Sequence, residues 1–192
     1  MGDERHTGER HARELWWWAV PSVLLLVGMT VWGVVRYPDL PDRVPRHIGP
    51  GGVDAWGERG VGLAFMPVFA YAGLTVVIAG CAWMVGRRTP QDRMPPAKNV
   101  WAAAAAVSDN RPASAASARR TVKALLLCNA LFGLAFLPMA WVHWRTEETE
   151  AVAWWLLAAP LTLVLLSMVP VLLAAWRDLG ERRALREHRR AA

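Results

Sequence analysis

Residues 15–35 read LWWWAVPSVLLLVGMTVWGVV, a run of 21 residues without a charged side chain. A helix needs about 20 apolar residues to cross the bilayer's hydrocarbon core. Tryptophans stand at both ends, Trp16 to Trp18 at one and Trp32 near the other, as is typical of membrane interfaces. A cleaved signal peptide has a shorter apolar segment of about 7–15 residues. The run therefore predicts an uncleaved transmembrane helix.

Three further runs, 61–86, 124–142 and 152–176, also lack Asp, Glu, Lys, Arg and His. Between the runs lie many of the 22 Lys and Arg residues, which give the chain a net charge of +6. A bilayer selects this segregation because a charge at its centre costs several kcal/mol. We therefore predict an all-α fold, an integral membrane bundle of four transmembrane helices with a Pro/Gly-rich outer loop.

The positively charged residues predict the orientation of the helices. Three lie in residues 1–14, eight in residues 87–123 and six in residues 177–192, which makes 17 on one side. The other side has four in residues 36–60 and one in residues 143–151. Because the richer side is usually cytoplasmic, we expect a multi-pass protein of the plasma membrane with both termini in the cytoplasm.

These boundaries divide the chain into five parts. Residues 1–14 form a cytoplasmic segment, 15–86 a two-helix unit with the outer loop 36–60, and 124–176 a second helical hairpin. Residues 87–123, which are rich in Pro, Ala and Ser, are expected to be a flexible cytoplasmic loop. The arginine-rich tail 177–192 has two interpretations: an extension of the fourth helix that sets the topology, or a docking segment for anionic lipid headgroups or a cytoplasmic regulator. Anionic lipid explains the basic residues more simply than nucleic acid does.

The outer loop 36–60 holds four prolines and five glycines in 25 residues. Prolines restrict φ and glycines permit tight turns, so the combination predicts a defined folded loop. The segment 49–52, Gly-Pro-Gly-Gly, is predicted to be a turn that brings His47 and Asp54 close together.

This loop resembles a bacterial membrane family, the domain of unknown function no. 1648, which occurs in SdpI-type immunity proteins. The similarity covers about residues 15–86, although Ile48 stands where the family usually has an aromatic residue and the glycine-to-aspartate spacing is one residue shorter. The resemblance implies a loop between two transmembrane helices. It points to a set of functional residues: Pro41, Asp42, Pro45, His47, Gly52, Asp54 and Trp56.

We find no set of nucleophile, base and supporting groups in the sequence, and we predict no enzyme activity. The candidate metal ligands Asp42, His47, Asp54, His143, Glu147, Glu148 and Glu150 lack diagnostic spacing, so we expect no metal and no cofactor. A structural hydrogen bond between His47 and Asp54 is the preferred interpretation. Asn129, the most polar residue within the spans, is expected to bond across a helix–helix contact.

The leading hypothesis is a non-enzymatic membrane protein whose outer loop senses or neutralises an extracellular peptide or toxin. Its inner face is expected to engage a cytoplasmic regulator, and no nucleic acid is expected to bind. Two alternatives remain open: a small transporter or channel-like subunit with a polar path lined by Asn129, Thr75 and Ser167, and a structural accessory subunit of a membrane complex.

Overall fold

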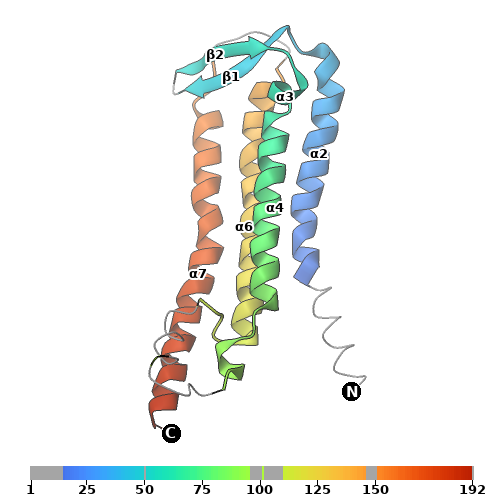
Figure 1. The fold of residues 1–192 in the computed structure, drawn as a ribbon. Helices are drawn as coiled ribbons and strands as arrows, with labels where there is room; N and C mark the ends of the chain where they lie inside the picture. The colour runs from blue at the N-terminus through green and yellow to red at the C-terminus, as the bar shows by residue number, and fades with distance from the viewer. Residues whose placement is uncertain (1–14, 50, 96–100, 102–109, 146–150, 192) are drawn as a thin grey trace, which may run out of the picture.

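Four long helices lie side by side in the computed structural model, which describes residues 15–49, 51–95, 101, 110–145 and 151–191 (Figure 1). They are α2 (Val20–Arg36, extended at its start by the 3-10 turn Trp17–Ala19), α4 (Met66–Arg87), α6 (Ala115–His143) and α7 (Trp155–Ala191). Each is long and apolar enough to cross a membrane. The prediction of four transmembrane helices is therefore confirmed, and the chain is a multi-pass membrane protein.

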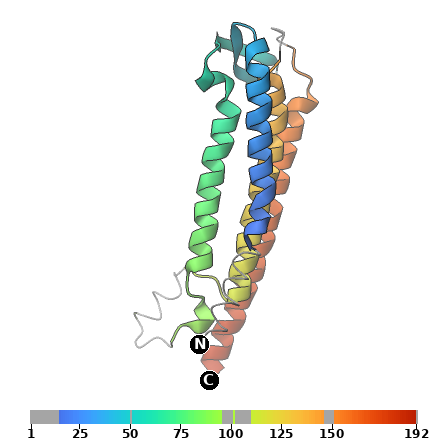
Figure 2. The same cartoon turned by 90° about the vertical axis from the view of Figure 1, so that its right-hand side faces the viewer.

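A β-hairpin lies across one end of the bundle (Figures 1 and 2). Between α2 and α4 the chain forms the 3-10 turn Tyr37–Asp39, the strands β1 (Arg43–Gly49) and β2 (Gly52–Glu58), and the short helix α3 (Val61–Ala64). The sequence predicted a folded, turn-rich loop here, and the structure adds that its two halves pair as antiparallel strands. We call this end of the molecule the hairpin end, and the opposite end, where α7 finishes, the tail end.

Helix α6 occupies the centre of the bundle and packs against α2, α4 and α7. Polar side chains reinforce its contact with α4. The Asn129 amide donates a hydrogen bond of 3.1 Å to the Thr75 hydroxyl, and the Tyr71 hydroxyl donates one of 3.2 Å to the backbone carbonyl of Asn129. Lipid tails are as apolar as leucine, so transmembrane helices rely on close packing and such interhelical bonds rather than on the hydrophobic effect.

The outward faces of the helices are apolar. Val31 of α2, Val76 of α4, and Leu165 and Leu172 of α7 are each more than half exposed. A soluble monomer rarely exposes contiguous apolar surface on this scale. The same surface is stable against acyl chains, which agrees with the membrane assignment.

At the tail end the structure corrects our prediction that residues 87–123 form a flexible loop. Helix α6 begins at Ala115, well before the expected residue 124, and the Ser114 side chain caps it by accepting a hydrogen bond of 3.1 Å from the Ser117 N–H. The backbone N–H of Gln91 donates to the carbonyl of Pro112 at 2.9 Å, and that of Asp92 to Ala113 at 3.1 Å. The loop prediction is therefore wrong for residues 115–123, which are helical, whereas residues 88–95 and 110–114 do connect the helices and residues 96–100 and 102–109 lie outside the described part.

The fourth span likewise continues past its apolar run. Helix α7 extends without a break through the tail to Ala191, and its tail-end portion packs beside the start of α6. Residues 90–94, 110–122 and 177–189 together form a compact extension of the bundle, which we call the stalk.

Candidate functional site

The hairpin forms because its turn and its pairing are both specified locally. Gly52 has a φ of 121°, a backbone conformation that residues other than glycine rarely adopt. Its strand pairs with β1 in a register that sets Gly49 opposite Gly52 and Pro45 opposite Trp56. Two irregularities, between Pro45 and His47 and between His47 and Ile48, interrupt this register. The hairpin is therefore a twisted ribbon with one face toward the bundle.

Apolar side chains on the bundle-facing side of the hairpin fix it to the helices. Val44 is fully buried in a cluster that includes Met29 of α2 and Tyr71 of α4, and Val53 packs with Val142 and Leu156 at the ends of α6 and α7. Burying a valine side chain stabilises a fold by about 1.5–3 kcal/mol. The hairpin consequently docks on all four helices rather than projecting as a free loop.

Arg59 closes the base of the hairpin, and sequence reasoning missed it. Its guanidinium donates a hydrogen bond of 2.5 Å to the Leu40 carbonyl and lies 3.7 Å from the Asp42 carboxylate. Its backbone N–H also donates to the Asp42 carbonyl at 2.8 Å. The sequence feature that could have indicated this role is the position of Arg59 directly after β2, opposite Asp42, which precedes β1.

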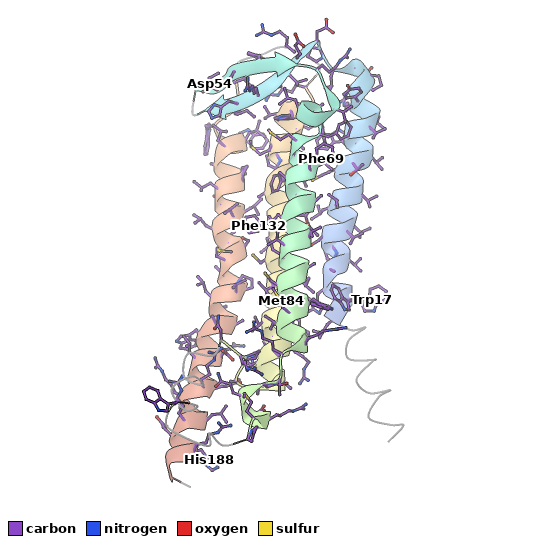
Figure 3. The ribbon with its side chains drawn as sticks, viewed as in Figure 1. Trp17, Asp54, Phe69, Met84, Phe132 and His188 are labelled. Carbon is purple, nitrogen blue, oxygen red and sulfur yellow. The ribbon has the colours of Figure 1, made fainter. Side chains whose placement is uncertain are left out.

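His47 and Asp54 face each other across the two strands, as the predicted turn requires. The His47 Nδ1 and Asp54 Oδ1 atoms are 2.5 Å apart, and both side chains are more than half exposed. Figure 3 shows Asp54 at the hairpin end. A Cβ on Gly49 would lie 2.8 Å from the Asp54 carboxylate, so the missing side chain leaves room for the pair. The site thus presents a paired imidazole and carboxylate on the outer surface of the hairpin.

The other residues indicated by the resemblance serve different parts of the hairpin. Pro45 is buried within β1, Pro41 is half-buried at the entry to the hairpin, and the Asp42 side chain is almost fully exposed. Trp56 is partly buried and packs against the cluster of Val53, Val142 and Leu156. The residues singled out from the sequence therefore include both structural positions and an exposed pair, and the exposed pair is where a ligand has access.

The residues considered as metal ligands do not come together in the described part of the chain. That part holds no group of three or more His, Cys, Asp or Glu side chains placed to bind a metal. His143, counted among the candidates of the second outer loop, is only 2% exposed, and its ring nitrogens make no hydrogen bond to a described residue. It is a buried residue at the end of α6 and not a loop ligand. Glu147, Glu148 and Glu150 lie outside the described residues.

Two of the three polar residues considered for a path through the bundle are hydrogen-bonded to each other. Asn129 and Thr75 bond to each other, and Asn129 is only 2% exposed. The Ser167 hydroxyl of α7 instead donates to the carbonyl of Val164 in its own helix, at 2.6 Å. Asn129 thus lies at a helix–helix contact between α6 and α4.

Comparison with known proteins agrees with the resemblance seen in the loop. No curated protein and no solved structure matches the chain. One family model does match, over most of α2, the whole hairpin, α3 and the start of α4, which is shorter than the 15–86 expected from the sequence. Residues 24–70 of this chain match the model of a domain of unknown function (DUF1648).

Proposed function

We propose that this chain is a non-enzymatic protein of the bacterial plasma membrane that senses or neutralises an extracellular peptide or toxin at its hairpin. In this proposal the hairpin end faces outward and both termini are cytoplasmic, because 17 of the 22 Lys and Arg residues lie in segments on the other side. The tail end then faces the cytoplasm, where a regulator is available to it.

One observation carries the proposal: an exposed His47–Asp54 pair on a hairpin that is otherwise anchored through buried residues. Fixing an exposed polar pair on a rigid base reduces the entropy lost when a ligand binds. The imidazole and the carboxylate together offer both a donor and acceptors to the backbone or side chains of a peptide. The pair lies in the segment that matches the family model, which supports a role shared by that domain.

Sensitivity of the native host to envelope-active peptides tests the proposal. Deletion of the gene is expected to increase the sensitivity to at least one peptide in a panel, and the wild-type gene is expected to restore resistance. The double variant His47→Ala/Asp54→Ala is expected not to restore it. Its stability is expected to change little, because an exposed pair of polar side chains contributes at most about 1 kcal/mol.

Glu58→Ala is the matched control, because Glu58 is also exposed and lies on the same strand as Asp54. It is expected to restore resistance as the wild type does, with equal amounts of each protein in the membrane. Unchanged sensitivity after deletion would refute the proposed function, and full restoration by the double variant would refute the role of the pair.

The hydrogen bonds of Asn129 favour a packing role for this residue over the transporter alternative. Asn129 and Thr75 bond to each other across the contact between α6 and α4, whereas residues that line a path need groups free to bind the transported species.

A further inference from the structure

Two acidic side chains of the stalk, Asp178 and Glu181, join α7 to the start of α6. Asp178 is 7% exposed and accepts hydrogen bonds from the Ala113 N–H at 2.8 Å and from the Ser117 hydroxyl. It also pairs with Arg182 one turn later, at 2.6 Å. A buried carboxylate needs such partners because an unpaired buried charge is costly. The negative charge of Asp178 is therefore compensated within the stalk.

The negative charge of Glu181 is compensated in the same way. Its carboxylate accepts a hydrogen bond of 2.9 Å from the Ser114 hydroxyl and pairs with the Arg120 guanidinium. Arg189 in turn donates to the carbonyl of Gln91 at 2.7 Å, so α7 also holds the segment before α6. The stalk is thus a connected unit, stabilised by contacts between three separate parts of the sequence.

This arrangement leaves three exposed arginines of α7 without a bonding partner among the described residues. Arg177, Arg183 and Arg186 are exposed, and none of them bonds or pairs with a described residue. Glu187 is the exposed carboxylate in residues 177–189. Arg183 and Arg186 consequently make the outward side of α7 basic, with Glu187 as the carboxylate beside them.

The position of two of these arginines places them beyond the apolar core of the bilayer. Lys123 lies 5.5 Å from the Trp18 ring and Arg87 lies 4.5 Å from the Trp83 ring, which marks the membrane interface at the tail end. Figure 3 shows Trp17 and Met84 at one level and His188 far beyond them. With a rise of 1.5 Å per residue, Arg183 and Arg186 lie about 10–15 Å past Trp176 along the helix. Attraction to headgroups is screened over about 8 Å in physiological salt.

An apolar residue shares their face of the helix. Leu179 is 51% exposed and lies four residues before Arg183 and seven before Arg186, a spacing that places all three on one side. Arginine binds carboxylates through two parallel hydrogen bonds. We propose that Leu179, Arg183 and Arg186 form a docking surface for an acidic, amphipathic helix of a cytoplasmic protein, with carboxylates on the arginines and an apolar residue on Leu179. This proposal rests on the proposed function for its cytoplasmic orientation and for the kind of regulator.

Binding of a defined peptide to the full-length protein tests this surface. The protein is reconstituted in nanodiscs of zwitterionic phosphatidylcholine, and the probe is a labelled helical peptide with glutamates along one face and leucines along the other. Fluorescence anisotropy is expected to show saturable binding that empty nanodiscs lack. The variant Arg183→Glu/Arg186→Glu is expected to weaken it at least tenfold, and Leu179→Ser several-fold. The thermal unfolding midpoint is expected to stay unchanged, because all three side chains are exposed.

Arg88→Glu/Arg93→Glu is the matched control, since it makes the same change in net charge at two other exposed arginines of the tail end. The control is expected to bind as the wild type does. Equal weakening by both double variants would overturn the proposal, because the probe would then respond to net charge alone. Binding that appears only with phosphatidylglycerol in the nanodisc would overturn it in favour of a lipid site. These outcomes leave the peptide-sensing role of the hairpin untouched, since neither the hairpin nor its ligand takes part.

Discussion

The indole N–H of Trp144 donates a hydrogen bond of 2.8 Å to the backbone carbonyl of Ala64, 80 residues earlier in the chain. Both residues are buried, Trp144 at 3% exposure and Ala64 at 0%. Ala64 ends α3, which follows the hairpin directly, and Trp144 caps the end of α6. This bond therefore attaches the hairpin segment to the central helix.

Replacing Trp144 by Phe is expected to lower the free energy of unfolding by about 1 kcal/mol, because the Ala64 carbonyl loses its buried donor while an aromatic ring is retained. Thermal or denaturant unfolding in detergent measures the change. Trp141→Phe serves as the control, since that ring is 53% exposed, and it is expected to change stability by less than half as much. Equal effects of the two substitutions would show that the bond contributes nothing.

Gly52→Ala is expected to destabilise the hairpin by about 1 kcal/mol, because its φ of 121° is unfavourable for a residue with a Cβ. Hydrogen exchange of the amides in residues 43–58 is expected to accelerate accordingly. Gly51→Ala is the matched control in the same turn, where an added Cβ meets nothing within 4 Å. Similar exchange rates in the two variants would contradict the conformational argument.

Asn129 and Thr75 are expected to be coupled in stability. The substitutions Asn129→Leu and Thr75→Val are each expected to cost about 0.6–2 kcal/mol, and the double variant less than their sum, because either change removes the same pair of hydrogen bonds. Unfolding in detergent measures the four proteins of the cycle. Additive losses would show that the two side chains do not interact.

Asp178→Ala is expected to loosen the stalk, because it leaves Arg182 and the Ala113 N–H without their carboxylate. Removing one partner of a buried ion pair costs about 3–5 kcal/mol, and Asp178 is buried enough for the lower part of that range. Limited proteolysis between residues 88 and 114 is expected to be faster in the variant. Glu187→Ala, at an exposed position, is expected to leave the cleavage rate unchanged.

The proposed orientation predicts the behaviour of reporter fusions. Alkaline phosphatase, which is active only outside the cytoplasm, is expected to be active when fused after Arg59 and inactive when fused after Arg120. A fluorescent protein that requires the cytoplasm is expected to show the reverse. Phosphatase activity after Arg120 would mean that the hairpin end faces inward.

The sequence predicted the spans well because lipid selects directly for uncharged runs of about 20 residues. It predicted the extent of the helices less well, because a charge marks the edge of the membrane and not the end of a helix. Arg119, Arg120 and Lys123 therefore suggested a loop where α6 already runs. Ser114, followed by an alanine-rich segment, was the available sign of a helix start.

In the candidate site, the turn and the approach of His47 to Asp54 followed from glycine and proline placement. The pairing of the strands did not, because the irregularities around His47 disturb the alternation by which a strand is detected. The role of Arg59 also did not follow from the sequence, because it depends on a hydrogen bond to a carbonyl 19 residues away. Contacts of this kind arise only once the chain has folded.

The attachment of Trp144 to Ala64 sets an order for biosynthesis. Residues 24–70 leave the ribosome long before α6 does, so the hairpin lacks the part of its supporting surface that α6 supplies until the third span has been inserted. A fragment cut to the limits of the family match keeps Met29 and Val68 of the supporting surface but lacks Ala140 and Trp144. The domain is therefore defined by its own residues but completed by a helix that lies outside it.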